Sequence, residues 1–397
     1  MKPELNPFAP GVGFQPPALV GRCAILDEAS IAITRVAAGL HSKEMLLVGL
    51  RGVGKTVLLN AILAEVERRG FFTASCECIE TRHLAEALLP QLRSTLMRMS
   101  TAAAVKDGAQ RALRTLHSFV AQIKLSYEGL RLTFDGPKEA GAADSGDLSA
   151  DLTDLFVSIG EAARASNTAL TIFVDEMQYL NEESLRALLM ALHKINQRGL
   201  PIYFVGAGLP PLIGNMGNSR SYSERLFSVP TMGPLSRTDV RDALTIPIEK
   251  ANAFIEARAV DHIYRASGGY AYFVQEWGLH AWNAAKGQDI DLRAAQNADT
   301  LARESLDRSF FSFRFDRLTT AEKEYLRAMA SVAGTDPVKS GKIAELLGKK
   351  SNTVGYIRNG LVAKGMIYSP VYGDNAFTVP HFDQFMRRTM PGWRPKN

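Results

Sequence analysis

The stretch GLRGVGKT constrains this chain more than any other part of the sequence, because few folds can use it. It lies between the apolar runs EMLLV and VLL and fits the spacing G-x-x-x-x-G-K-[ST]. The loop comprises Gly49, Leu50, Arg51, Gly52, Val53, Gly54, Lys55 and Thr56. In such a loop glycines let backbone N–H groups face phosphate oxygens, the lysine reaches the outer phosphates, and the hydroxyl ligates magnesium. We expect residues 49–56 to bind nucleotide phosphates at a helix N-terminus.

Short apolar runs alternate with longer amphipathic runs on both sides of this loop. The runs EMLLVG, FFTASCE, ALTIFVDE and LPIYFVGAG have the length and composition of strands, and the latter two are typical of strands buried on both faces. Helical patterns separate them. This order predicts an α/β fold with a parallel sheet, the core of a P-loop NTPase.

A pair of carboxylates follows one of these apolar runs. In TIFVDEMQYL, Asp175 ends the run and Glu176 comes next. The carboxyl ends of parallel strands are where an open α/β sheet binds its ligand. Asp175 is therefore expected to support Mg2+ through water, and Glu176 to accept a proton from an attacking water molecule. The alternative for Glu176 is a solvated carboxylate at a strand end.

The pattern of apolar and polar residues changes along the chain, which suggests several structural units. Residues 127–131 suggest a hairpin within an insertion, and the last unit is expected to contain three helices and a hairpin, the pattern of a winged helix. The expected units are an extended arm at 1–18, the P-loop core at 19–234 with an insertion at about 100–146, a helical lid at 235–317, and the winged helix at 318–397.

The basic charge is concentrated in the last unit. The formal net charge is +5, and residues 318–397 hold 12 Lys or Arg against 6 Asp or Glu. Such a patch is compatible with binding to a polyanion, although a solvated basic face is the alternative. No apolar run has the roughly 18–20 residues that a membrane span needs, so we expect a cytoplasmic protein with no membrane partner.

Six motifs, in order, resemble those of one family. PPALVGR, the phosphate loop, FVDEMQ, VGAGLPPL, SYSERLF and SGGYAYFVQEWG are similar to bacterial AAA+ ATPases close to the origin-recognition and archaeal-ATPase (STAND-neighbouring) clades. The resemblance implies the strand order 5-1-4-3-2, a helical lid, and ATP with Mg2+ as the bound nucleotide. It also implies that the turn containing Leu19, Val20, Gly21 and Arg22 packs on adenine. The alternative for this turn is an ordinary start of a helix.

The sequence departs from the family pattern at two places. The fourth strand places Ala207 near the position where relatives often have a polar phosphate sensor. The lid motif lacks the arginine that many relatives have, and Arg265 is a weak substitute. Gln178 offers another group that could orient water or report the nucleotide state, although it could also be an ordinary polar residue at the start of a helix. Fewer phosphate sensors suggest slow hydrolysis.

Arg225 in SERLF occupies the position where relatives often carry an arginine that reaches the nucleotide of a neighbouring subunit. Such an arginine stabilises the charge of the transition state. If Arg225 acts in this way, the active form is an oligomer that associates through the nucleotide site. A salt bridge with Glu224 is the alternative, and Arg220 is a second candidate for the role.

The winged helix offers two kinds of partner. Its expected recognition helix presents donors suited to double-stranded DNA, namely Lys349, Lys350, Asn352 and Arg358. The expected wing, VYGDN, carries no basic residue, and winged helices also dock proteins. The sequence thus predicts a Mg-ATP-dependent AAA+ ATPase that switches an oligomeric assembly on DNA. The alternative is a signalling switch that acts on a protein partner. A small-molecule kinase is poorly supported.

Overall fold

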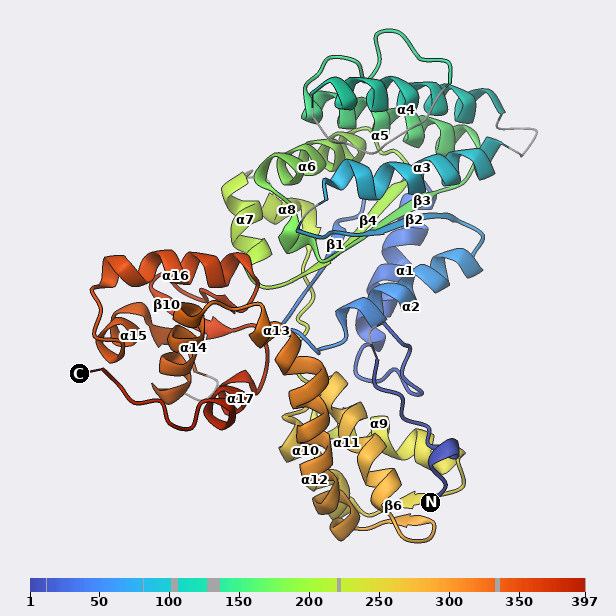
Figure 1. Cartoon of the computed structure of the whole chain (residues 1–397). Helices are drawn as coiled ribbons and strands as arrows, with labels where there is room; N and C mark the ends of the chain where they lie inside the picture. Colours follow the sequence, from blue (N-terminus) through green and yellow to red (C-terminus); the bar gives the residue numbers. More distant parts are fainter. Residues whose placement is uncertain are drawn as a thin grey trace.

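The structure is a computed structural model that describes residues 1–11, 13–80, 82–100, 106–126, 136–219, 223–332 and 336–396. It has a central sheet covered by helices, a group of lid helices below the sheet and a smaller C-terminal group beside them (Figure 1). The hairpin expected at 127–131 and the candidate Arg220 lie outside the described residues.

The central sheet has five parallel strands in the order β2-β3-β4-β1-β5. They span β1 Glu44–Val48, β2 Phe72–Glu77, β3 Leu170–Asp175, β4 Ile202–Gly208 and β5 Phe227–Ser228. The resemblance implied this order, counted from the other edge. Every residue of β1, β3 and β4 is buried, which explains their continuous apolar sequence.

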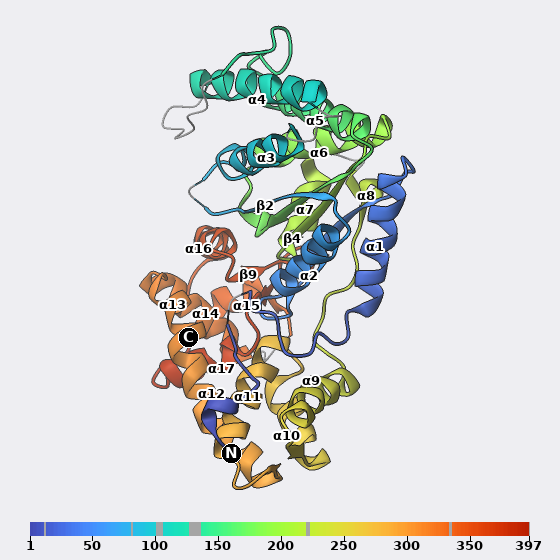
Figure 2. The same ribbon diagram turned by 90° about the vertical axis from the view of Figure 1, so that its right-hand side faces the viewer.

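Helices cover both faces of the sheet (Figure 2). On one face α1 Cys23–Ala37 and α2 Lys55–Arg68 pack against β-strand side chains such as Met45 and Leu47. Their neighbours Leu46 and Val48 point to the other face, as the two-residue period of a strand requires. The helices on that face are α3 Leu84–Ser100, α5 Leu148–Ala165 and α6 Glu182–Gln197, with α4 Lys106–Ser126 packed outside α3 and α5.

Two short helices follow β4 at the end of the sheet. They are α7 Pro211–Ser219 and α8 Ser223–Leu226. The chain then leaves the sheet and enters the lid, where two short strands, β6 Phe254–Ile255 and β7 Asp289–Ile290, pair in parallel. The lid helices are α9 Arg237–Lys250, α10 Ala257–Ser267, α11 Ala271–Ala284 and α12 Leu292–Leu306.

The C-terminal group joins the lid through a π-helical turn, Asp307–Phe311, and the short helix α13 Ser312–Asp316. Its strands form an antiparallel sheet in the order β8-β10-β9. Its other elements are α14 Thr320–Val332, β8 Val338–Lys339, α15 Ser340–Leu346, α16 Ser351–Ala363, β9 Ile367–Tyr368, β10 Asp374–Phe377 and α17 Phe382–Thr389. Helix α17 was not predicted from the sequence, and its buried Phe382, Phe385 and Met386 pack in the core of this group.

A single cluster of buried apolar side chains runs through the lid and the C-terminal group. It extends from Leu235 in the lid to Met386 in α17 and includes Phe8 of the N-terminal segment. The two groups therefore share a core, whereas the sheet has its own clusters on each face. No helix within the described ranges is long and apolar enough to cross a bilayer.

Candidate nucleotide-binding site

A cavity of about 820 Å³ lies at the carboxyl end of β1, where several parts of the chain meet. The phosphate loop forms its floor. Residues of the N-terminal arm, including Gly13 and Phe14, line another wall, and α11 contributes Tyr272. Lys364 and Met366 come from the C-terminal group. The cavity thus lies among the sheet, the arm, the lid and the C-terminal group.

Two glycines give the phosphate loop its shape. A Cβ atom at Gly49 would lie 2.5 Å from the carbonyl oxygen of Met232, so this position has no room for a side chain. Gly54 has a φ of 94°, a left-handed conformation that other residues rarely adopt, and α2 begins immediately after it. The loop consequently turns into the N-terminus of α2, where helical N–H groups and the helix dipole favour an anion.

Lys55 and Thr56 lie at the start of α2 as the motif predicts. The Lys55 ammonium donates to the carbonyls of Gly49 and Leu50, each at 3.0 Å. Burial lowers the pKa of Lys55 to about 8, and the Glu176 carboxylate opposes this change. A bound phosphate would satisfy the desolvated ammonium better than two neutral carbonyls, since a charged pair makes the stronger hydrogen bond.

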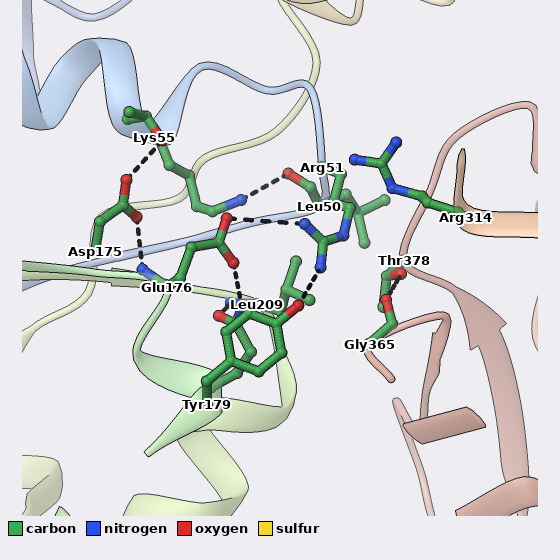
Figure 3. A network of polar contacts seen from close by, with 12 residues as sticks. Leu50, Arg51, Lys55, Asp175, Glu176, Tyr179, Leu209, Arg314, Gly365 and Thr378 are labelled. Carbon is green, nitrogen blue, oxygen red and sulfur yellow. Dashed lines mark hydrogen bonds and ion pairs between the residues drawn. The ribbon is translucent and has the colours of Figure 1, made fainter. Parts of the chain in front are cut away.

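Asp175 faces the phosphate loop across the sheet edge (Figure 3). One of its carboxylate oxygens accepts from the Thr56 hydroxyl at 2.7 Å, and the other accepts from the backbone N–H of Glu176 at 2.7 Å. Burial raises the pKa of Asp175, while the Thr56 hydrogen bond opposes that rise. A hydroxyl and a carboxylate side by side are oxygen ligands of the kind that Mg2+ prefers, so these residues fit the ion.

Glu176 is held by two neighbours. Its φ of 53° places it in the left-handed region, which is unusual for a residue with a side chain. The Arg51 guanidinium lies 3.8 Å from one carboxylate oxygen. The Gln178 side-chain amide donates to the other oxygen, and its own oxygen accepts from the backbone N–H of Leu209 at 3.0 Å. Gln178 therefore links Glu176 to the end of β4.

The fourth strand itself offers no polar side chain to the cavity at Ala207. This residue is fully buried and packs in the cluster between the sheet and α1 and α2. Gln178 reaches the end of β4 from the next loop instead. From the sequence, Gln178 was a candidate only, because its contact with Leu209 depends on the folded path of two separate loops.

Leu19, Val20 and Arg22 all line the cavity. Val20 also packs against the lid cluster. The buried Arg22 guanidinium donates to the carbonyls of Gly233 at 2.6 Å and Val53 at 3.3 Å. Arg22 therefore ties the turn to the phosphate loop, and the apolar side chains provide the surface on which a flat base could pack.

The phosphate loop forms hydrogen bonds with two other parts of the chain. In the lid, the backbone N–H of Tyr272 donates to the carbonyl of Gly52 at 3.0 Å. On the other side, the backbone N–H of Arg51 donates to the carbonyl of Thr378 at 3.0 Å. Gly365 packs against the Arg51 side chain in the same contact, and the Thr378 hydroxyl donates to the Gly365 carbonyl. The loop is thus held between the lid and the C-terminal group.

The structure places Arg314 in the cavity, which the sequence analysis missed. Its guanidinium lies 4.3 Å from the centre of the Phe310 ring and donates to the Phe310 carbonyl. Arg265 is not a substitute for the missing lid arginine, because it is exposed, donates to the Asp261 carbonyl and is not among the cavity-lining residues. Nothing in the sequence near Arg314 resembles a motif, so only the fold could identify it.

Arg225 lies away from this cavity. It is exposed on α8, and it forms no ion pair with Glu224 or with any other residue in the described part of the chain. The salt bridge that we considered as an alternative is therefore not formed. An exposed, unpaired arginine remains available to a second molecule.

Of the candidate DNA-binding residues, Lys349, Lys350 and Asn352 lie around the start of α16 and Arg358 lies within the helix. Lys350 and Asn352 are exposed, and Lys349 is partly exposed. The Arg358 side chain is hydrogen-bonded within the C-terminal group, where its guanidinium donates to the Asn375 side chain at 2.9 Å and to the Ser369 hydroxyl. Tyr356 on the same helix and Tyr372 in the β9–β10 connection are among the most exposed large side chains of the described residues.

Comparisons with known families agree with this geometry. Residues 18–205 match the AAA ATPase domain, and residues 308–386 match a domain of unknown function, DUF8462. The chain has the AAA P-loop NTPase fold with a parallel five-stranded sheet, and an activity of the general ATPase kind follows from the domain match. No curated protein sequence matches the chain.

Similar solved structures include the Walker-type ATPase of Pyrococcus abyssi, with a TM-score of 0.59 and 14% identity over 93% of this chain and 96% of that one. ORC1 of Aeropyrum pernix in complex with DNA has a TM-score of 0.46 and 17% identity, covering 94% and 93% of the two chains. RuvB of Thermotoga maritima, a Holliday junction branch migration motor, has a TM-score of 0.43 and 13% identity, covering 94% of this chain and 96% of that one.

Proposed function

We propose that this chain binds Mg-ATP and uses slow hydrolysis to switch the arrangement of its C-terminal group within an oligomeric assembly. The contact between Arg51 and Thr378 carries this proposal. One backbone N–H makes one strong hydrogen bond, so the Arg51 amide can serve either the Thr378 carbonyl or a phosphate oxygen. Nucleotide binding and docking of the C-terminal group therefore compete at the same atom.

The phosphate loop supplies the binding groups in this proposal. Amides of residues 49–56 and the Lys55 ammonium hold the phosphates, while the turn with Val20 and Arg22 borders the adenine. Thr56 and Asp175 hold Mg2+, which when bound neutralises phosphate charge and orients the terminal phosphate for displacement. The 2.7 Å contact between the Thr56 hydroxyl and the Asp175 carboxylate supports their shared role.

Glu176 is the general base in the proposed hydrolysis. It removes a proton from water as that water attacks the terminal phosphate, and the bond between this phosphate and ADP breaks. In the described structure Glu176 is engaged by Gln178 and lies 3.8 Å from Arg51. A base held in this way is less available to water, which is consistent with slow turnover.

The proposed assembly uses Arg225 in trans. Its exposure, its absence from the residues that line its own cavity and the absence of an ion pair in the described ranges support contact with the terminal phosphate of a neighbouring subunit. Arg220 stays an alternative because it lies outside the described residues. We propose that this assembly acts in the cytoplasm.

The chain is proposed to contain the arm 1–18, the ATPase core 19–234, the lid 235–317 and a winged helix at 318–397. The order of α14, β8, α15, α16, β9 and β10, with a three-stranded sheet, supports the winged helix. The family matches at 18–205 and 308–386 are compatible with two principal units, although the second begins before residue 318.

Double-stranded DNA is the first proposed target of the winged helix. Lys349, Lys350 and Asn352 lie at the N-terminal end of α16, where a recognition helix contacts phosphates and base edges. Arg358 would join them only by leaving its partners Asn375 and Ser369. The basic charge of this part of the chain favours a polyanion.

A protein partner is the second candidate target, and one observation favours it. Tyr356, Val371 and Tyr372 are exposed by 88%, 65% and 102% on α16 and the adjacent β9–β10 connection. Exposed tyrosines and an aliphatic side chain on neighbouring elements are typical of a surface that binds protein. This version of the switch needs no DNA.

Steady-state ATP hydrolysis with and without double-stranded DNA at low salt tests the proposal. The chain should hydrolyse ATP slowly, and Glu176→Gln should lose this activity by about a hundredfold or more while it retains ATP binding. Glu182→Gln is the matched control, because Glu182 is an exposed carboxylate on the following helix. Stimulation by DNA supports the DNA-bound assembly. ATP binding with negligible turnover in either condition supports the protein-partner switch, and no binding of Mg-ATP contradicts both.

A further inference from the structure

Two arginines from distant parts of the chain meet at the phosphate loop. Arg51 belongs to the loop itself, and Arg314 belongs to α13, which connects the lid to α14. Both line the cavity, and the Arg314 side chain extends toward Arg51 (Figure 3). Like charges brought together in a partly buried place repel each other, so an anion between them would stabilise the arrangement.

The protein supplies little negative charge to this pair. Glu176 lies 3.8 Å from the Arg51 guanidinium, which is longer than a hydrogen bond. No carboxylate forms an ion pair with Arg314 in the parts of the chain that the structure describes. The Nε atom of Arg51 is buried without a hydrogen-bond acceptor. The site therefore has unused donors and an excess of positive charge.

The position of Glu176 indicates which part of the nucleotide belongs between these arginines. In the proposed function Glu176 activates the water that attacks the terminal phosphate, so this phosphate must lie close to it. Arg51 is beside Glu176. Burial and the nearby Arg51 charge lower the pKa of Arg314 to about 10, and the Glu176 charge opposes this change.

We propose that Arg314 binds the terminal phosphate of ATP in its own subunit, together with Arg51, and so distinguishes ATP from ADP. This inference rests on the proposed function and names the residue that fills the role for which the lid motif has no arginine. A guanidinium fork suits phosphate oxygens because it donates two parallel hydrogen bonds.

The location of Arg314 gives the contact a consequence for the whole chain. Arg314 lies within residues 308–386, the segment that matches DUF8462 and also contains Gly365 and Thr378. Its own backbone follows the π-helical turn Asp307–Phe311, and its guanidinium already holds the Phe310 carbonyl. Binding or loss of the terminal phosphate would therefore act directly on the segment that docks against the phosphate loop.

The test compares equilibrium binding of Mg-ADP with that of Mg bound to a non-hydrolysable ATP analogue, by calorimetry on the full chain. Arg314→Ala should weaken the analogue by about tenfold or more, the size expected for a lost charge-assisted hydrogen bond, and leave ADP within about twofold. Arg314→Lys keeps the charge without the fork and should lie between the wild type and Arg314→Ala.

Arg308→Ala is the matched control, since Arg308 lies on the adjoining turn, is exposed and is not among the cavity-lining residues. It should leave both affinities unchanged. Equal weakening of the analogue and ADP by Arg314→Ala, or no weakening of either, overturns the inference while nucleotide binding by the wild type still supports the proposed function. Failure of the wild type to bind either nucleotide overturns both.

Discussion

The backbone N–H of Arg51 donates to the carbonyl of Thr378 at 3.0 Å, so the phosphate loop is bonded to a segment near the other end of the sequence. Arg51 lies at the centre of the nucleotide motif, and Thr378 follows the last strand of the C-terminal group. A phosphate loop works by aiming its amides at an anion. The docked arrangement therefore occupies a group that nucleotide binding requires.

Gly365 allows this docking, and its replacement should loosen it. The residue has a φ of 62°, and a Cβ atom there would lie 3.2 Å from both the Arg51 guanidinium and Leu209. Gly365→Ala adds backbone strain of about 1 kcal/mol and crowds the contact. Because docking and nucleotide compete for the Arg51 amide, we expect release of a fluorescent ADP analogue to become several-fold slower in a stopped-flow experiment.

Gly341→Ala is the control for this experiment, because a Cβ atom at Gly341 meets nothing within 4 Å and the residue lies in α15. It should release ADP at the rate of the wild type. Equal release rates for Gly365→Ala and the wild type would show that the docked contact does not compete with bound ADP.

Arg225→Ala should slow hydrolysis only where molecules associate. Because Arg225 is exposed and lies away from its own cavity, ATP affinity should stay unchanged while the specific rate falls by at least about tenfold. The specific activity of the wild type should rise with protein concentration. Arg186→Ala removes another exposed arginine, on α6, and should have no effect. A concentration-independent rate that Arg225→Ala does not change would exclude the trans role.

Glu44 should make stability depend on pH. Burial raises its pKa from 4.5 to about 8, although its oxygens accept from the Phe204 N–H and the Asn196 amide. Between these values the unfolded state loses its proton first, so this contribution to stability is full below pH 4.5 and is lost as pH rises to about 8. The slope is at most about 1.4 kcal/mol per pH unit.

Chemical denaturation of the wild type and Glu44→Gln across this pH range measures the effect. The difference between the two free energies of unfolding should change in favour of the variant as the pH rises, because glutamine does not ionise. A difference that stays constant with pH would mean that Glu44 does not titrate in this interval.

Phe8 should anchor the N-terminal segment to the lid. It is 2% exposed within the lid cluster, and the amide of Asn6, two residues before it, donates to the Leu279 carbonyl at 2.9 Å. Phe8→Ala should lower the free energy of unfolding by about 3 kcal/mol. Phe14→Ala, at a residue that is 66% exposed in the same arm, should change it by less than about 0.5 kcal/mol. Denaturant titration distinguishes the two, and equal effects would contradict an anchoring role.

Local sequence was enough to predict the phosphate loop and the strand that carries Asp175. Their backbone geometry depends on adjacent residues, as Gly54 and the start of α2 illustrate. The same reasoning could not find Arg314, because its approach to Arg51 depends on how the lid, α13 and the C-terminal group pack together. Nor could it show that the Arg358 side chain is hydrogen-bonded to Asn375 and Ser369. These partners come later in the sequence and are brought to Arg358 only by the fold.

Helix α17 is a second element that the sequence alone did not predict. Its sequence, FDQFMRRT, is short and follows Pro380, so periodicity alone gave little signal. Its apolar residues pack in the core that the lid and the C-terminal group share, as the stacking of Phe311 on Phe385 shows. Tertiary packing rather than intrinsic propensity decides such a segment.

The central claim is that the nucleotide state controls docking of the C-terminal group at the phosphate loop. Hydrogen–deuterium exchange of residues 49–56 and 365–378 tests it most directly, with Mg-ADP and with a non-hydrolysable Mg-ATP analogue at saturation. We predict faster exchange of residues 365–378 with the analogue, and no difference between nucleotides in Lys55→Ala, which should bind neither. Identical exchange of this segment in the two nucleotide-bound states of the wild type would contradict the account.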